Sequence, residues 1–369
     1  MAAKKILIGS RKGLLTLEGG DGDWRFTRSA HLGNPVEYAV EDPRTGTQWA
    51  AIDHGHWGEK LHRSKDGGES WEEIALPKFP EGEKVFLAFA QGEEKTKAAT
   101  LENVWVIEPG AADQRGRIYL GTNPGGLFVS DDGGESFELN RPLWDHPSRA
   151  QGMWFGGGRD TPGIHSVVID PRDSSHLYVG ISCAGVFESR DDGKSWRPMN
   201  KGLKAPFLPT PEAETGHDPH FVALCPAEPE TLWQQNHVGV YISRDGAASW
   251  AEVSQEIGPV GFGFPVAVHA QRPETAWVVP GVSDEQRMAV GGSLCVCRTE
   301  DGGKSWTELR EGLPQENAYD VVYRHALDID GETLAFGSTT GNLYLSEDGG
   351  ELWKCVGGNL PPIYSVRFA

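Results

Sequence analysis

The sequence lacks the short motifs that identify several classes of enzyme. It has no GxxxxGK[ST] phosphate-binding loop, no GxSxG nucleophile motif and no GxGxxG that follows a strand. Three glycines stand together at residues 156–158, but no helical pattern follows them. A glycine-rich phosphate cradle needs a helix N-terminus behind it, so the glycines argue against such a site.

Positive charge and long apolar runs are also scarce. Lys and Arg number 34 against 53 Asp and Glu, which gives a net charge of −19. An acidic surface repels nucleic acids and anionic membranes, so we expect neither as a partner. No apolar run approaches the roughly 18 residues of a membrane span, and the first residues show no apolar signal segment. We therefore expect a cytoplasmic protein.

Cysteine is too rare and too irregularly spaced for a disulfide framework. There are five cysteines, an odd number, and no CxxC pair. We expect buried free thiols. Cys295 and Cys297 are two positions apart, so on a strand they project from the same side.

What the sequence does contain is a repeat. The pattern Ser/Thr-x-Asp-x-Gly-x-Ser-Trp/Phe recurs six times, at intervals of 47 to 66 residues. Its copies begin at Ser64, Ser130, Ser189, Ser243, Thr299 and Ser346. Ala247 replaces the glycine of the fourth copy, and Leu352 replaces the second serine of the sixth. Such self-similarity indicates a repeat architecture.

The chemistry of this box is that of a tight turn. An Asp side chain accepts backbone N–H bonds within the turn, Gly supplies a positive φ, and Trp begins the next strand and packs between sheets. We therefore predict a structural role, not a catalytic one, for the box aspartates. These are Asp66, Asp132, Asp191, Asp245, Asp301 and Asp348.

The segments around each box predict four antiparallel strands, the unit of a β-propeller blade. Residues 1–30 supply three strands of one blade, and residues 361–369 supply its missing first strand. A shared blade closes the ring and removes two sheet edges. We therefore predict an all-β, seven-bladed propeller formed as a single domain by residues 1–369, with six further blades between about residues 31 and 360.

The six boxes, which with their blades cover nearly the whole chain, resemble those of the BNR/Asp-box propeller superfamily. That superfamily includes sialidases, xyloglucanase-type glycoside hydrolases, sortilin-type receptors and a photosystem II assembly factor. Segments such as WFGGGRDTPGIHS, FGFPVAVH, AYDVVYRH and LAFGSTTG are similar to a bacterial group labelled glycosyl hydrolase or exo-α-sialidase-like. The resemblance implies a glycosidase-like activity on carbohydrate.

Strand geometry predicts where a site lies. First strands line the central channel, and ligands of such folds bind where loops converge at its mouth. Aligning the seven first strands places one residue of each at the rim: Glu37, Asn103, His165, His220, Phe264, Asp320 and Tyr364. Loops between second and third strands add Arg11 and His237, and insertions at residues 154–160, 214–220 and 283–287 end on the same face. Most of these residues are polar, unlike a ring made only for packing.

The first interpretation of this rim is a glycoside hydrolase. Such an enzyme needs one carboxylic acid to protonate the leaving oxygen and a second carboxylate as base or nucleophile. Asp320 and Glu37 are the predicted pair. Trp154 and Tyr364 are candidates to stack on sugar rings, and Arg159 and Arg11 to hold an acidic group of the ligand. His165, His220, His237 and Asn103 complete the predicted ligand-binding set. A true sialidase is disfavoured, because no triad of arginines and no Arg-Ile-Pro motif can be assigned.

Two alternatives stay open. His165 and His220, on successive blades, could hold a divalent metal for a hydrolase or lyase, although no local HExxH spacing supports this; otherwise these histidines bond loop backbone or line a wet channel. The second alternative is a non-catalytic scaffold that presents its face to a protein partner, because a propeller fold alone does not imply an activity.

Overall fold

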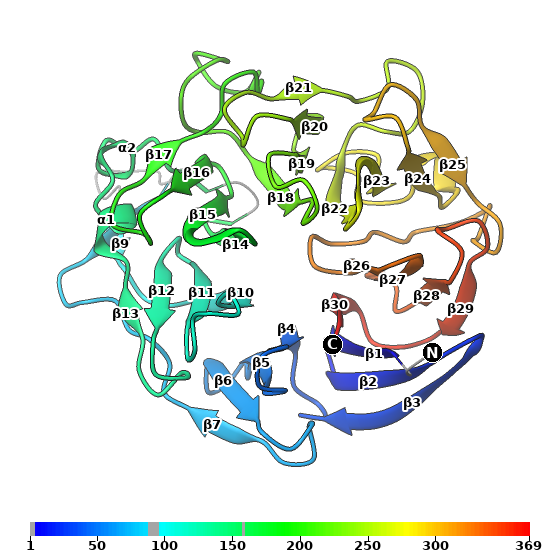
Figure 1. Cartoon of the computed structure of the whole chain (residues 1–369), viewed down its shortest axis with the longest axis horizontal. Helices are drawn as coiled ribbons and strands as arrows, with labels where there is room; N and C mark the ends of the chain where they lie inside the picture. The colour runs from blue at the N-terminus through cyan, green and yellow to red at the C-terminus, as the bar shows by residue number, and fades with distance from the viewer. Residues whose placement is uncertain (1–3, 88–95, 157–158) are drawn as a thin grey trace.

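The computed structural model describes residues 4–87, 96–156 and 159–369, so residues 1–3 of the shared blade and Gly157 and Gly158 of the 154–160 insertion lie outside it. Seven four-stranded antiparallel sheets stand in a ring around a central axis (Figure 1). The predicted all-β, seven-bladed propeller is thereby confirmed. None of the helices in the described part of the chain is long and apolar enough to cross a membrane.

The ring closes in the blade that both ends of the chain share. Its strands, from the outside inward, are β3 (Asp23–Ala30), β2 (Gly13–Gly20), β1 (Lys4–Ser10) and β30 (Ile363–Phe368). β1 pairs antiparallel with β30 through partners such as Ile8 and Val366, and Figure 1 shows the two strands side by side. The C-terminal strand is therefore the innermost strand of the blade that the N-terminal segment begins, as the sequence predicts.

The other six blades are each continuous in sequence. Innermost strand first, two of them contain β4 (Val36–Glu41), β5 (Gln48–Asp53), β6 (Glu59–Ser64) and β7 (Glu72–Ile74), and then β10 (Asn103–Pro109), β11 (Ile118–Asn123), β12 (Leu127–Ser130) and β13 (Glu138–Leu139). The next two contain β14 (Ile164–Asp170), β15 (Asp173–Ile181), β16 (Gly185–Ser189) and β17 (Arg197–Pro198), and then β18 (Pro219–Leu224), β19 (Leu232–Asn236), β20 (Gly239–Ser243) and β21 (Ala251–Glu252). The last two contain β22 (Gly263–His269), β23 (Arg272–Pro280), β24 (Val296–Thr299) and β25 (Thr307–Leu309), and then β26 (Leu327–Asp330), β27 (Thr333–Gly337), β28 (Leu343–Ser346) and β29 (Lys354–Gly357).

Short elements fill the connections between blades. A two-stranded ribbon joins β8 (Lys84–Phe86) to β9 (Thr96–Ala98). Two single-turn helices, α1 (Arg141–Trp144) and α2 (Pro147–Ala150), follow β13, and a 3₁₀ turn, η1 (Val290–Gly292), precedes β24. α1 begins where the Asn140 side chain accepts from the N–H of Leu143, with a proline in its first turn, which is the usual chemistry of a helix start.

The six boxes form the turns between third and fourth strands. In the first, Oδ1 of Asp66 accepts the N–H groups of Glu69 and Ser70, and Oδ2 accepts the Ser70 hydroxyl at 2.5 Å. The box tryptophans connect blades: Nε1 of Trp250 donates to the carbonyl of Met199 in the preceding blade at 2.8 Å. The box aspartates are thus engaged within their own turns.

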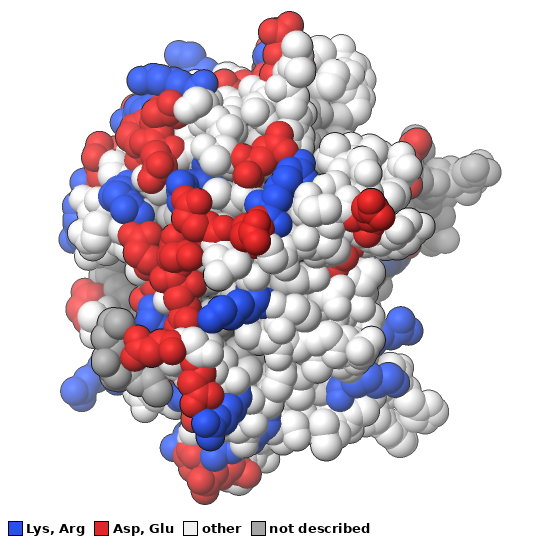
Figure 2. All heavy atoms as spheres, turned by 90° about the vertical axis from the view of Figure 1, so that its right-hand side faces the viewer, with Lys and Arg blue, Asp and Glu red and all other residues white. Residues whose placement is uncertain are grey.

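The hydrophobic core lies between the sheets, where large rings such as Trp49, Trp233 and Trp277 are almost fully buried. The outside of the ring is charged. On the side that Figure 2 shows, Asp and Glu gather toward one edge, with Lys and Arg among them.

Candidate functional site

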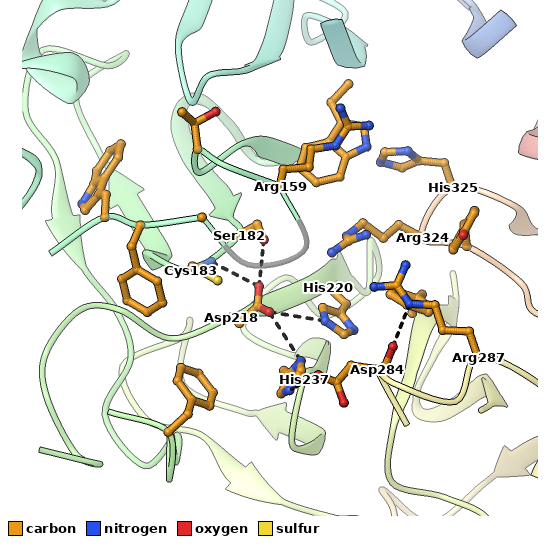
Figure 3. Close-up of a pocket in the computed structure, with 18 of the residues that line it drawn as sticks. Arg159, Ser182, Cys183, Asp218, His220, His237, Asp284, Arg287, Arg324 and His325 are labelled. Atoms are coloured by element: carbon orange, nitrogen blue, oxygen red, sulfur yellow. Dashed lines mark hydrogen bonds and ion pairs between the residues drawn. The ribbon is translucent and has the colours of Figure 1, made fainter. Parts of the chain in front are cut away.

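A cavity of about 990 Å³ opens where the innermost strands begin. Its wall is formed by residues before and at the starts of β4, β10, β18, β22 and β30. Further residues come from the segments that precede β10, β14 and β18 and from the loop after β23. Its polar lining includes Glu37, Arg159, Ser182, Asp218, His220, His237, Asp284, Arg287, Arg324, His325 and Tyr364. Aromatic rings complete it: Phe86, Trp105, Trp154, Phe155, Phe207, Phe262, Phe264 and Tyr323. Figure 3 shows this site.

Three arginines meet at the cavity from three different segments of the chain, although the sequence alone allowed no triad of arginines to be assigned. Arg159 lies in the segment before β14, Arg287 in the loop after β23, and Arg324 just before β26. Among the described residues, none of the three forms an ion pair with a carboxylate, although most other arginines of the chain do, such as Arg117 and Arg63. The cavity thus brings together three guanidinium groups without a direct carboxylate partner among the described residues, although Glu37, Asp218 and Asp284 line the same cavity.

Aromatic rings hold these guanidinium groups in place. The Arg324 guanidinium lies 4.8 Å from the centre of the Trp105 ring and 5.3 Å from that of Phe264. The Arg159 guanidinium lies 5.1 Å from the centre of the same Trp105 ring, and that of Arg287 lies 5.5 Å from the centre of the Phe264 ring. Burial lowers the pKa of Arg324 to about 10, and its Nε has no hydrogen-bond partner among the described residues. Arg324 stays charged at neutral pH.

Glu37 is a carboxyl group of the cavity that lies close to Arg159. Its Oε2 accepts a hydrogen bond of 2.6 Å from Nδ2 of Asn103, and Oδ1 of Asn103 in turn accepts from Arg159 at 3.3 Å. Burial raises the pKa of Glu37, while Arg159 and the Asn103 bond oppose that shift. Burial also raises the pKa of the neighbouring Glu59, to about 8, so Glu59 is largely protonated at neutral pH.

Asp218, His220 and His237 form a cluster on a further part of the wall. Oδ2 of Asp218 lies 3.5 Å from Nε2 of His220 and 3.6 Å from Nδ1 of His237. The other oxygen of Asp218 accepts from the Ser182 hydroxyl at 2.9 Å and the Cys183 N–H at 3.1 Å. Figure 3 shows both imidazoles directed at the carboxylate. These three side chains are the one group of potential metal ligands found within residues 4–87, 96–156 and 159–369.

The structure brings five of the predicted site residues to this cavity. They are Glu37, Arg159, His220, His237 and Tyr364. Trp154 also borders the cavity, but it is only 1% exposed, its Nε1 donates to Ser148, and its ring packs against Phe187. It is a core residue and lacks the open ring face that sugar stacking requires.

The other predicted residues lie elsewhere. Asn103 stands behind Glu37, and Arg11 lies outside the cavity lining, with its N–H bonded to the carbonyl of Pro362. His165 is fully buried and lines a second cavity of about 420 Å³ further along the inner strands. It therefore does not line the cavity at the mouth, and a metal ion shared by His165 and His220 stays a prediction.

Asp320 is also misplaced by the sequence alignment. The innermost strand of its blade, β26, begins only at Leu327, and Asp320 lies in the irregular segment before it. Oδ1 of Asp320 accepts hydrogen bonds from Ser338, Thr340 and Asn342. It thereby holds the loop between β27 and β28 and is not part of the cavity wall. A catalytic role for Asp320 stays a prediction that this geometry does not favour.

Arg324 and His325 are the residues that the alignment missed. β14 ends at Asp170 and β26 at Asp330, each immediately before the turn to the next strand. Counting back five residues from these ends gives His165 and His325. The two histidines therefore occupy equivalent positions. Alignment on the strand ends, Ile-Asp in both, would have identified His325, the neighbour of Arg324, as the rim residue of this blade.

Comparison with known proteins supports the fold and a likeness to glycoside hydrolases. No protein-family model matches the chain. An oligoxyloglucan-reducing end-specific xyloglucanase from Emericella nidulans is 27% identical over 275 residues, which is 66% of this chain and 31% of that protein. The chain thus spans about a third of the length of this curated relative. An ancestral GH74 enzyme superposes with a TM-score of 0.57 at 16% identity, over 90% of this chain and 38% of the other.

A second similar solved structure is not named as a hydrolase. YCF48 from Cyanidioschyzon merolae superposes with a TM-score of 0.53 at 17% identity, over 93% of this chain and 95% of that one. At these identities the superpositions show the propeller fold alone. The likeness to glycoside-hydrolase propellers expected from the sequence holds, and the chemistry of this chain has to be argued from its own cavity.

Proposed function

We propose that this chain is a glycoside-hydrolase-like propeller that binds a sugar-sized ligand carrying an acidic group at the mouth of its channel. The observation that carries the proposal is the meeting of Arg159, Arg287 and Arg324 at one cavity without an ion-paired carboxylate among the described residues. Arg324 is half-buried, and buried or half-buried charges are normally paired, whereas Arg159 and Arg287 are exposed. A guanidinium group matches carboxylate and phosphate oxygens in geometry, so an acidic ligand is the partner that we propose for these three groups.

The rest of the cavity agrees with a ligand of that size and kind. Its volume of about 990 Å³ lies at the upper end of the range for small-molecule sites, about 300–1,000 Å³. Trp105 and Phe264 supply apolar surface beside the guanidinium groups. The chain is acidic overall, with a net charge of −19, so the arginines also provide the local field that attracts an anion against the general repulsion.

Hydrolysis is the reaction that the carboxyl groups support best. Glu37, whose pKa is raised by burial, is suited to protonate a leaving oxygen as general acid. Asp320 lies away from the cavity, so the second carboxylate of a two-acid mechanism comes from Asp218 or Asp284, which both line it. The similarity to a protein named as a xyloglucanase supports carbohydrate as the substrate class.

Calorimetric titration with matched ligands tests the binding proposal. Glucuronate, galacturonate and a sugar phosphate are compared with glucose and a xyloglucan oligosaccharide, using wild type, Arg324→Met and the control Arg25→Met. Arg25 is 76% exposed and pairs with Asp23 on the outermost strand β3. Loss of a charge-assisted bond is worth about 1.5–3 kcal/mol, so Arg324→Met should weaken binding of the acidic sugars at least tenfold, while Arg25→Met leaves it unchanged.

Equal binding of neutral and acidic sugars, unaffected by Arg324→Met, would contradict the proposal. Binding of no ligand in the panel would favour the scaffold that presents its face to a protein. Hydrolysis is tested separately by following the release of reducing ends from the oligosaccharides that bind. Glu37→Gln should abolish release and keep binding, because the amide fills the same space but cannot donate a proton as an acid.

A further inference from the structure

We infer that Asp218, His220 and His237 bind a divalent transition-metal ion of the zinc class on the wall of the cavity. Two imidazoles and one carboxylate are a frequent ligand set for such ions. The inference rests on the geometry of these three side chains and is independent of the proposed binding of acidic sugars, which rests on the arginines. It concerns residues that the sequence alignment did not combine, since Asp218 was not among the rim residues.

The antiparallel register of β18 and β19 brings the three ligands together. Asp218 and His220 flank Pro219, the first residue of β18, so they stand two positions apart in extended chain and face the same side. Pro219 pairs with Asn236, the last residue of β19. His237 follows at once, and its N–H donates to the carbonyl of Asp218 at 2.9 Å. The cluster is therefore placed by backbone that the blade itself holds in position.

The distances from Asp218 to the two imidazoles are too long for good hydrogen bonds and close to the separation of two ligand atoms on one metal ion. Oδ2 of Asp218 is 3.5 Å from Nε2 of His220 and 3.6 Å from Nδ1 of His237, whereas a good hydrogen bond between nitrogen and oxygen measures about 2.7–3.2 Å. Two atoms at about 2.0–2.1 Å from one tetrahedral zinc ion are about 3.3–3.4 Å apart. All three donor atoms lie within 4.8 Å of one another. His237, whose side chain is 27% exposed, has room to close the remaining gap.

The hydrogen bond that His220 makes outside the cluster leaves its Nε2 free to bind a metal ion. Nδ1 of His220 lies 2.6 Å from the carbonyl of Gly263, and a carbonyl only accepts, so Nδ1 carries the proton. In the neutral ring the lone pair then lies on Nε2, which faces Oδ2 of Asp218. Two lone pairs opposed in a buried place repel each other unless a proton or a metal ion stands between them. A metal-bound histidine is typically oriented by such a bond from its other nitrogen.

Hydrogen bonds also orient the carboxylate of Asp218 and leave one of its oxygens free. Ser182 and the N–H of Cys183 occupy its Oδ1, which fixes the carboxylate and leaves Oδ2 for an ion. Asp284 lies beyond the cluster, with its Oδ2 3.8 Å from Nε2 of His237, where it favours positive charge on the ligand set. Arg324 opposes a cation, since its charge acts on both Asp218 and His220. Arg287, whose Nε donates to the carbonyl of Asp284 at 3.0 Å, is a second positive group of the same cavity.

The site has an open side. Asp218, His220 and His237 all line the cavity of about 990 Å³, so an ion held by three protein ligands keeps a fourth position toward it. Three ligands and one open position is the arrangement of zinc sites that bind water or substrate, whereas structural zinc sites are closed by four protein ligands. Imidazole nitrogen selects against Ca²⁺ and Mg²⁺, which prefer oxygen ligands.

Calorimetric titration of the full chain with ZnCl₂, after dialysis against a chelator, tests the inference. We expect one zinc ion per chain. Asp218→Asn and His237→Gln, which conserve side-chain volume, should each weaken binding at least tenfold. His269→Gln is the matched control: His269 lies in β22 outside the cavity, with its Nε2 3.4 Å from a single carboxylate, Glu332. That variant should bind zinc as wild type does.

Cobalt(II) distinguishes this site from a thiolate site at Cys295 and Cys297, whose sulfur atoms are 3.8 Å apart. Binding at the cavity should give the visible absorption of a four-coordinate ion, lost in His237→Gln and kept in Cys295→Ser. Absence of saturable zinc binding by wild type would overturn the inference. So would binding that survives both Asp218→Asn and His237→Gln, or binding that disappears in Cys295→Ser. The melting temperature of each metal-free variant shows whether it folds, and the partly exposed His237 is the safer of the two substitutions.

Discussion

Asn103, the first residue of β10, donates a hydrogen bond of 2.6 Å from Nδ2 to Oε2 of Glu37 on β4. The two strands belong to neighbouring blades, so this bond crosses from one sheet to the next. Its amide oxygen accepts from Arg159 at 3.3 Å. One buried amide thus orients the candidate acid of the cavity and one of its three arginines, and it does so without lining the cavity itself.

Asn103→Ala should raise the pKa of Glu37. Burial already raises this pKa, and the Asn103 bond and the charge of Arg159 oppose the rise. Removing the amide deletes a bond that stabilises the ionised carboxylate and releases Arg159. The measurement is an NMR titration of the Glu37 side-chain carboxyl carbon, assigned by its absence in Glu37→Gln. An unchanged or lower pKa in Asn103→Ala would show that the bond does not control this group.

Glu59 should make the stability of the chain decrease as the pH rises. Burial raises its pKa from 4.5 to about 8 in the folded state. Between these two pH values the folded chain keeps a proton on Glu59 that the unfolded chain has released. The contribution of protonated Glu59 to stability is therefore complete below pH 4.5 and is lost as the pH rises to about 8. Glu59→Gln removes this dependence and can keep the bond from the N–H of Val104 to Oε1.

The difference in unfolding free energy between Glu59→Gln and wild type should accordingly grow in favour of the variant between pH 4.5 and pH 8, by on the order of a few kcal/mol. Urea denaturation at several pH values measures it. Glu81→Gln, at an exposed position, is the control and should run parallel to wild type. A constant difference across this pH range would mean that Glu59 ionises normally in the folded chain.

The sequence was sufficient for the blades because their signals are local. Each box carries its turn within eight residues, and the alternation of the strands fixes which face is buried. The shared blade could also be predicted, since residues 361–369 read as a first strand without a blade of its own.

The site was predicted only in part, because it depends on register and on the lengths of irregular segments. The apolar residues Val321 and Val322 mimic a strand, but they belong to the irregular segment before β26. The alignment therefore selected Asp320 and passed over Arg324. Asp218 was missed for another reason: it precedes its strand, and only the pairing of Pro219 with Asn236 shows that it meets His237.

Arg324→Met should stabilise the fold while it weakens ligand binding. Arg324 is charged, partly buried between Trp105 and Phe264, and without an ion pair or a partner for Nε among the described residues. Methionine keeps the contact of sulfur and methylene groups with both rings and removes the cost of burying the charge. We expect a gain on the order of 1 kcal/mol in urea denaturation.

Arg287→Met is the matched comparison for this gain. Arg287 also lies over Phe264, at 5.5 Å, but it is exposed, so the substitution should weaken binding of acidic sugars and leave the unfolding free energy within about 0.5 kcal/mol of wild type. Equal stability of wild type and Arg324→Met would mean that the guanidinium is as well solvated in the cavity as in the unfolded chain.

Leu352→Ser should stabilise the sixth box. In the other five boxes a serine hydroxyl at this position donates to Oδ2 of the box aspartate, at 2.5 to 2.7 Å. Asp348 lacks this bond, because Leu352 offers only its N–H. Leu352 is 43% exposed, so little apolar burial is lost, and a new hydrogen bond contributes about 0.5–1.5 kcal/mol. Leu352→Ala loses the same apolar contacts without gaining the hydroxyl, so its melting temperature, measured beside that of Leu352→Ser, isolates the bond. A serine variant no more stable than the alanine variant would show that the hydroxyl adds nothing to this turn.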